Sequence, residues 1–206
     1  MKAVVQKQLA QSIATMQAVL ADESIADTLV RLSEITAASM KAGGKLLVAG
    51  NGGSAADAQH LVAEFVGRLT VTRPALRAIA LTTDSSIMTA VANDFSYDYI
   101  FERQLEALGA PGDVFLGIST SGNSKSIVRA VEHGRKAGIT TVGFTGNGGG
   151  EMAKHCDLNV IIPSNTTMNI QESHLALEHI FCMLVELCYF GPDFGGYVET
   201  RPQPAE

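Results

Sequence analysis

The sequence contains no tryptophan, few aromatic residues and little charge. Aromatic residues make up 6% and charged residues 17% of the 206 residues, whereas 46% are hydrophobic. This composition excludes a disordered chain and predicts one domain with a sizeable core. Cysteine is scarce as well. Cys156, Cys182 and Cys188 are odd in number and lack the spacing of metal ligands, so we expect buried free thiols in a reducing compartment.

Long apolar runs and targeting signals are also missing. No apolar run is expected to approach the ~18 residues of a membrane span, and residues 1–20 lack the basic-then-apolar pattern of a signal peptide. We therefore expect a cytoplasmic protein that does not bind membranes. Basic residues are outnumbered by acidic ones, and the formal net charge of −6 excludes nucleic-acid binding through a basic face. A phosphorylated ligand can still bind such a chain through local backbone donors.

The usual phosphate-binding fingerprints do not occur, because no GK[ST] is present and the glycines do not match GxGxxG. The stretch 45–68 nevertheless predicts a strand, a glycine turn and a helix. The apolar run 46–48 indicates a buried strand, and Asn51, Gly52, Gly53 and Ser54 form a turn of small residues that we call the first turn. Such units direct backbone N–H groups and a helix N-terminus at an anion.

The helix after the first turn carries His60 and Glu64, which are four residues apart and share one face. An imidazole above a carboxylate, close to an anion-sized turn, can hold a metal ion or move a proton. Taken singly, His60 is equally well explained as a surface or core-edge histidine. A similar unit downstream favours the functional interpretation.

Apolar periodicity predicts five strands alternating with helices, and hence an open parallel sheet in a three-layer α/β sandwich. Two helices over 3–42 precede the sheet. They either cover it or bundle with other copies of the chain. The strands are expected at 46–48, 77–81, 113–118, 140–144 and 158–163, and the last helix at 170–190. The tail 192–206, rich in Pro and Gly, is expected to be loosely held.

The second unit places the sequence STSGNS (119–124), here called the second turn, between a buried strand and a helix. Four hydroxyls and an amide in this turn favour a phosphate site built from dipoles and hydroxyl donors. The alternative is an ordinary Ser-rich turn. Asn93 and Asp94 interrupt the helical pattern between the two units, and they form either a simple helix end or a contact to the ligand.

Five stretches together resemble the sugar isomerase (SIS) domain family, and within it the phosphoheptose isomerases: GNGGSAADAQH, AVANDF, GDVFLGISTSGNS, GFTGNGGGEMA and IQESHLALEHI. The resemblance runs from about Lys41 to Gly191. It implies a SIS-type, flavodoxin-like domain over 1–191 whose helical extension, 1–43, serves oligomerisation. It also implies a cytoplasmic homotetramer with active sites near subunit interfaces.

The activity implied by the resemblance is an aldose–ketose isomerisation. Sedoheptulose 7-phosphate becomes D-glycero-D-manno-heptose 7-phosphate through an enediol, which supplies heptose for lipopolysaccharide precursors. Two alternatives remain: a non-catalytic relative that binds a replication initiator, and an isomerase or sensor for another phosphosugar. Retention of both Glu64 and His179, the acid–base pair implied by the resemblance, argues against the non-catalytic alternative.

The resemblance also implies roles for individual residues. Substrate contacts are expected from Asn51, Gly52, Gly53, Ser54, Glu64, Asn93, Asp94, Ser119, Thr120, Ser121, Ser124 and Gln171. One zinc ion per subunit is expected on His60, Glu64, Gln171 and His179. Apart from the resemblance, His174 is expected either to support a residue of the site or to be structural, and Glu178 is expected to be a solvent or interface charge.

The spacing of two expected zinc ligands raises a geometric question. Gln171 and His179 are eight residues apart, about 12 Å along a continuous helix, whereas zinc ligands lie ~2 Å from the ion. We therefore expect that the last helix begins after Gln171, or that a neighbouring subunit donates part of the site.

Overall fold

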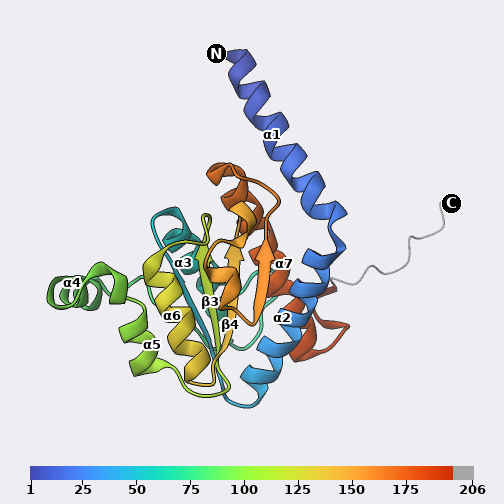
Figure 1. The fold of residues 1–206 in the computed structure, drawn as a ribbon. Helices are drawn as coiled ribbons and strands as arrows, with labels where there is room; N and C mark the ends of the chain where they lie inside the picture. Colours follow the sequence, from blue (N-terminus) through green and yellow to red (C-terminus); the bar gives the residue numbers. More distant parts are fainter. Residues whose placement is uncertain (197–206) are drawn as a thin grey trace.

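The structure, a computed structural model, describes residues 1–196. Five parallel strands form one sheet in the order β2-β1-β3-β4-β5 (Figure 1). The strands are β1 (Leu46–Gly50), β2 (Ala78–Ala80), β3 (Val114–Ser119), β4 (Thr140–Thr145) and β5 (Leu158–Ile161). The predicted parallel sheet is thus confirmed. Strand order reverses at β1, so the carboxyl ends of β1 and β3 lie side by side and form the switch point where such sheets bind ligands.

Helices cover both faces of the sheet and make the predicted three layers. They are α1 (Lys2–Ala21), α2 (Glu23–Lys41), α3 (Gly53–Val66), α4 (Ser85–Asp94), α5 (Glu102–Leu108), α6 (Lys125–Lys136) and α7 (Thr167–Phe190). Short 3-10 turns are η1 (Tyr97–Tyr99), η2 (Asn147–Gly149), η3 (Met152–Lys154) and η4 (Phe194–Gly196). Alternate strand residues enter two cores: Leu46 and Val48 pack with α2, α3 and α7, whereas Leu47 and Phe115 pack with α5 and α6.

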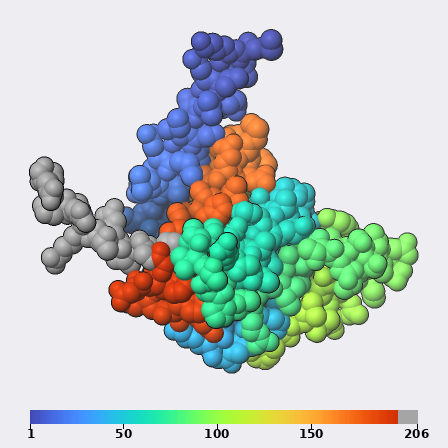
Figure 2. Space-filling view, turned by 180° about the vertical axis from the view of Figure 1, so that it is seen from behind, coloured from blue at the N-terminus to red at the C-terminus, as the bar shows by residue number. Residues whose placement is uncertain are grey.

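The two N-terminal helices differ in how much of their apolar surface the chain covers. Helix α2 buries seven residues, among them Leu29 and Leu32, against the sheet and α7. Helix α1 buries none and extends away from the body of the protein (Figures 1 and 2). Val5, Leu9 and Ile13 on α1 are each 59% exposed. The N-terminal helices were expected either to cover the sheet or to bundle with other copies of the chain. Helix α2 covers the sheet, whereas the apolar residues of α1 remain exposed to solvent in the single chain.

Among the described residues, one helix, α7, is long and apolar enough to cross a membrane by length and composition alone. The expectation that no segment approaches that length overlooked this helix, because Glu and His interrupt its apolar run. Phe181, Cys182 and Val185 of α7 are fully buried within the protein. A buried core helix of a globular domain has this pattern.

The beginning of the predicted tail is packed against the domain. Phe194 stacks on Phe190 with ring centroids 4.6 Å apart. The rest of the predicted tail, residues 197–206, lies outside the described residues.

Candidate active site

The first turn connects β1 to α3 at the switch point. Gly52 has φ +58, and α3 starts at Gly53 without a side-chain cap. A Cβ on Gly53 would lie 2.6 Å from Nε2 of Gln171, so only glycine lets the Gln171 amide reach this helix end. Asn51 joins the turn to the rest of the site: its Oδ1 accepts from Tyr97 Oη at 2.8 Å, and its Nδ2 donates to Ser126 Oγ at 3.0 Å.

The second turn connects β3 to α6 beside the first. Ser119 Oγ lies 2.9 Å from Ser124 Oγ and 3.4 Å from Ser121 Oγ, so three hydroxyls converge. Helix α6 also starts without a side-chain cap. Gly122 has φ +65, and the Gly149 carbonyl occupies the space that a side chain there would need. Both turns thus present an uncapped helix N-terminus, where backbone N–H groups favour an anion.

A compact group of two imidazoles and a carboxylate joins α3 to α7. His60 Nε2 and His179 Nε2 are 2.8 Å apart, and His60 Nε2 lies 3.7 Å from Glu64 Oε1. The rings of the two histidines meet edge to face. The Glu64 side chain is 18% exposed and that of His60 41%, so solvent and small molecules can reach the group.

The donor atoms fit a zinc ion. Ligand atoms of His60, Glu64 and His179 all lie within 4.8 Å of one another. Two ligands of a tetrahedral zinc at ~2.0–2.1 Å lie about 3.3 Å apart, between the two shorter separations seen here. Two imidazoles and a carboxylate are also the set found in catalytic zinc sites that keep a fourth position open. This group can therefore hold a metal ion.

Gln171 lies inside α7, which runs unbroken from Thr167. The expectation that the helix begins after Gln171 is wrong, because backbone hydrogen bonding extends the helix one turn further toward its N-terminus. Gln171 Nε2 donates to both carboxylate oxygens of Asp57, at 3.1 and 3.0 Å. This bond uses the amide nitrogen, so Oε1, the atom through which an amide binds a cation, takes no part in it.

Asp57 is a site residue that the sequence analysis missed. It lies one turn before His60 on α3 and is buried, and burial raises its pKa, although the Gln171 hydrogen bond and His60 oppose the rise. A cavity of about 300 Å³ opens at Asp57 and Gln171. The i, i+3 spacing of Asp57 and His60 could have placed Asp57 on the same helix face as His60. The contact of Tyr97 with Asn51 could not be predicted, because the two residues are far apart in the sequence.

Asn93 and Asp94 form the end of α4, and Asn93 Nδ2 donates to Asp94 Oδ1 at 2.8 Å. Both side chains are exposed. The segment that follows them, rather than these two residues, makes the observed contact with the first turn, through Tyr97.

Two further titratable groups of α7 lie deep in the core. Glu178 is fully buried, which corrects the expectation of a solvent or interface charge, and burial raises its pKa to about 8. His174 is equally buried, and its Nε2 lies 3.1 Å from the Thr145 carbonyl oxygen. Burial lowers the pKa of His174 to about 4. Burial therefore favours the uncharged form of both groups.

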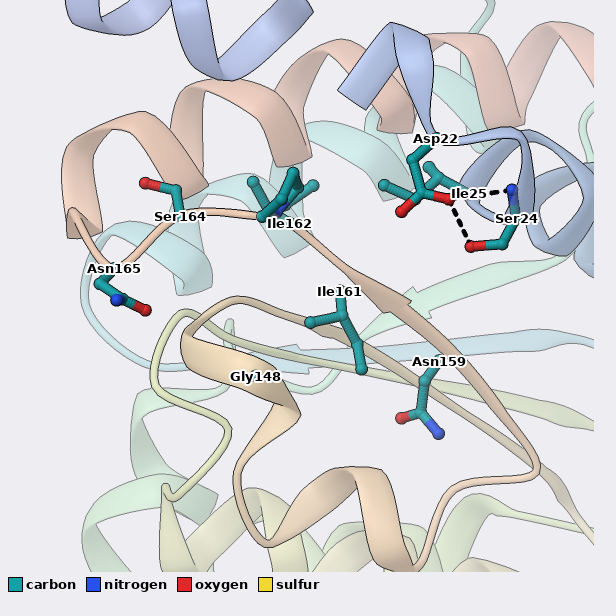
Figure 3. A pocket seen from close by; sticks show the side chains of 10 residues that line it. Asp22, Ser24, Ile25, Gly148, Asn159, Ile161, Ile162, Ser164 and Asn165 are labelled. Atoms are coloured by element: carbon teal, nitrogen blue, oxygen red, sulfur yellow. Dashed lines mark hydrogen bonds between the residues drawn. The ribbon is translucent and has the colours of Figure 1, made fainter. Parts of the chain in front are cut away.

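A separate cavity of about 430 Å³ lies between the α1–α2 junction and the end of β5 (Figure 3). Its charged group, Asp22, accepts hydrogen bonds from Ser24 and serves as the N-cap of α2. None of the residues predicted to act on substrate or metal lines this cavity. Its size alone does not make it the functional site.

Comparison with known proteins decides the family. The SIS domain model matches residues 9–146. The phosphoheptose isomerase of Burkholderia pseudomallei is 52% identical over 183 residues, covering 89% of this chain and 93% of the relative. That of Sulfurimonas denitrificans is 46% identical over 191 residues, covering 93% and 98%. This chain belongs to the phosphoheptose isomerases of the SIS domain family.

Solved structures of phosphoheptose isomerases have the same fold. The one from Neisseria gonorrhoeae superposes with a TM-score of 0.84 at 37% identity, over 90% of this chain and 98% of that one. The one from Francisella tularensis gives 0.84 at 32% identity, over 89% and 96%. The resemblance stated from the motifs is thereby confirmed, and the enzyme is a sugar-phosphate isomerase.

Proposed function

We infer that this chain converts sedoheptulose 7-phosphate to D-glycero-D-manno-heptose 7-phosphate through an enediol. One observation carries the proposal: His60 and Glu64 of α3 and His179 of α7 bring ligand atoms within 4.8 Å of one another, and α3 itself starts at one of the two uncapped turns. The names of the relatives at 46–52% identity support the same reaction. In a reducing cytoplasm, with its thiols free, the enzyme would supply heptose for surface glycans.

Glu64 and His179 are the proposed catalytic residues. Isomerisation of a ketose to an aldose removes a proton from C1 and returns one to C2, while the hydroxyl proton moves between the two oxygens. The half-buried Glu64 carboxylate moves the carbon-bound proton, and His179 moves the hydroxyl proton from the opposite helix. Their ligand atoms lie within 4.8 Å of one another, close enough to act on neighbouring carbons of one sugar.

Zinc, one ion per subunit, is the proposed cofactor. His60, Glu64 and His179 hold it, with Gln171 of the same or a neighbouring subunit as the further ligand. When bound, the ion polarises the sugar carbonyl and stabilises the charge that develops on it. Asp57 keeps the Gln171 amide in a fixed orientation through its two hydrogen bonds.

The two turns would bind the rest of the substrate. Ser119, Thr120, Ser121 and Ser124 are proposed to hold the phosphate together with the N–H groups at the start of α6. The small residues of the first turn, Asn51 to Ser54, are proposed to contact the sugar, with Asn93 and Asp94 at its hydroxyls. Binding energy at the distant phosphate then positions the reacting carbons.

A homotetramer is the proposed assembly, with active sites near the interfaces. The open stripe on α1 continues into an apolar groove of about 330 Å³ between α1, α2 and α7. A second copy would cover both, because monomeric proteins rarely expose apolar patches of this kind. Sedimentation analysis that found only monomers at micromolar concentration would refute this assembly.

The activity is tested by NMR of the product. Sedoheptulose 7-phosphate incubated with the enzyme in D2O is expected to give the aldose with deuterium at C2, and Glu64→Gln is expected to give none. Chelator treatment is expected to abolish turnover, and added zinc to restore it. If the parent enzyme leaves this substrate unchanged but turns over another phosphosugar, substrate identity is wrong; if no phosphosugar reacts, the non-catalytic alternative stands.

Sharing of the site between subunits has its own test. Subunits with Glu64→Gln are mixed with subunits that carry His179→Ala. Some sites in the mixed oligomers regain both an intact Glu64 and an intact His179 only if these two residues come from different chains. Because these groups converge within one chain, we expect inactive hybrids, and recovered activity would show that a neighbouring subunit supplies one of the two groups.

A further inference from the structure

Arg73 links the two helices that carry the metal-binding group. Its Nε donates to Glu186 Oε1 of α7 at 2.7 Å, and its Nη2 and Nη1 donate to the backbone carbonyls of Glu64 and Phe65 in α3, each at 2.7 Å. The side chains of Arg73 and Glu186 are both 0% exposed. One guanidinium thus spans three acceptors on two helices, which its flat five-donor fork allows.

The contacts of Arg73 fall on the last turn of α3, which ends at Val66. Carbonyls in that turn lack partners within the helix. Arg73 supplies donors for two of them, and its positive charge lies at the negative end of the helix dipole. One of these carbonyls belongs to Glu64 itself, so the contact fixes the backbone from which the Glu64 carboxylate extends.

On α7, Glu186 lies two turns beyond His179, on the same side of the helix. Asp57 and Gln171 join α3 to α7 at the other end of the group, since Gln171 lies eight residues before His179. The group of His60, Glu64 and His179 therefore lies, along α7, between two polar links, of which the Arg73–Glu186 link is fully buried. Each link connects α7 to α3 or to the chain that follows it.

We propose that Arg73, held by Glu186, is a positioning residue that fixes Glu64 relative to His179 and thereby the geometry of the metal-binding group. The proposal rests on the proposed function for its catalytic consequence, but its geometric content concerns metal binding alone. Arg73 donates to Glu186 and to the backbone carbonyls of 64, 65, 67 and 74, so it acts through α3 rather than on substrate.

Overall stability is the other explanation for this buried pair, and the chemistry distinguishes the two. A buried ion pair can often be replaced by apolar residues of similar volume without loss of stability. Such a replacement would keep the fold but remove the donors to the Glu64 and Phe65 carbonyls. A stability role predicts normal function after replacement, and a positioning role predicts a defect.

The experiment compares full-length Arg73→Lys, Glu186→Gln and the double variant Arg73→Met/Glu186→Met. Zinc affinity is measured by competition with a chromogenic chelator, together with kcat, KM and the unfolding temperature. We expect zinc affinity and kcat to fall about 10–100-fold in Arg73→Lys and in the double variant, as for other residues that support metal ligands. KM should change little, because both turns are intact, and the unfolding temperature shows which variants remain folded at the temperature of the assay.

Arg135→Lys is the matched control. Arg135 also pairs with a carboxylate, Asp157, and donates to a backbone carbonyl, that of His155, but it is exposed at the far end of α6. We expect parental zinc affinity and kcat for this control. Parental zinc affinity and kcat in Arg73→Lys, or in a folded double variant, would overturn the proposal.

If the double variant does not fold, the zinc affinities of the two single variants distinguish a positioning role from a stability role. A reduced zinc affinity in folded Arg73→Lys supports positioning, and an unchanged one refutes it. The chelator competition needs no substrate. A parent that binds zinc but lacks isomerase activity would therefore refute the proposed function and leave this inference standing.

Discussion

The units β1–α3 and β3–α6 share one backbone design but carry different chemistry. Each has a buried strand, a turn with a glycine at positive φ and a helix with no side-chain cap. Helix α3 then presents His60 and Glu64 toward α7. Helix α6 instead buries Ile127, Ala130 and Val131 in the opposite core. The second unit therefore offers hydroxyls and N–H groups, whereas the first adds ionisable side chains.

The comparison shows that two turns with the same backbone design differ in function according to which side chains the neighbouring helix contributes. Helix α7, with Gln171 and His179, faces α3 and completes a group that neither helix holds alone. The α6 residues that enter this core, Ile127, Ala130 and Val131, are apolar and offer no group that moves a proton. Substitutions in the two units should accordingly affect different constants.

The largest effect is expected for His60→Gln in the first unit. Loss of one of three converging donors should reduce zinc affinity by more than the about 10–100-fold typical of supporting residues, with a parallel loss of kcat. Chelator competition and steady-state kinetics measure both. Zinc affinity equal to that of the parent would show that His60 is not a ligand, and the contrast between the units would lose its basis.

Gly53→Ala should give the next largest effect. The new Cβ would lie 2.6 Å from Gln171 Nε2 and 2.7 Å from its Oε1, so the amide has to leave Asp57. We expect kcat/KM to fall about 10-fold, with little change in unfolding temperature because a flexible side-chain end moves. Gly53→Ala combined with Gln171→Ala serves as control, since removing the amide first should make the two effects non-additive. Strict additivity would contradict this explanation.

Ser124→Ala tests the second unit. One hydroxyl of the converging set is lost, and a hydrogen bond to a charged group contributes about 1.5 kcal/mol or more, so KM for the phosphosugar should rise about 10-fold. Zinc affinity and kcat should stay close to parental values. A fall in kcat with unchanged KM would assign Ser124 to the chemical step and remove the distinction between the two units.

His174→Gln tests the buried polar groups behind the site and should have the smallest effect at neutral pH. The pKa of His174 is about 4 in the folded protein and 6.5 in the unfolded chain. The unfolded chain therefore binds the proton first, so the stability present above pH 6.5 is lost as pH falls toward 4. We expect the parent to lose about 3 kcal/mol more than His174→Gln across this window in urea unfolding. Parallel pH profiles would contradict the assignment.

Local patterns predicted most of the fold. Apolar runs and glycine turns located all five strands to within three residues, because burial on both faces leaves a continuous apolar signal. Spacing along one helix likewise paired His60 with Glu64. The sequence could not predict what packs against α1, because a row of apolar residues on a helix does not identify its partner.

Contacts between distant segments were the part of the site that the sequence did not reveal. Arg73 and Glu186 are 113 positions apart, and a single Arg in a loop carries no mark of its partner. The start of α7 was mispredicted for a related reason. A late start of α7 was one of two ways to bring Gln171 and His179 to one ion, but backbone hydrogen bonds continue the helix to Thr167, and the Gln171 amide nitrogen donates to Asp57.

The unbroken run of α7 limits how this protein can change in evolution. Gln171, His179 and Glu186 project from one rod, each toward a different level of α3. Inserting a single residue between the first and the last of them would turn everything beyond it by about 100° and advance it by about 1.5 Å. Changes in length should therefore be tolerated at the ends of α7 and in surface loops, while the segment 171–186 keeps its length.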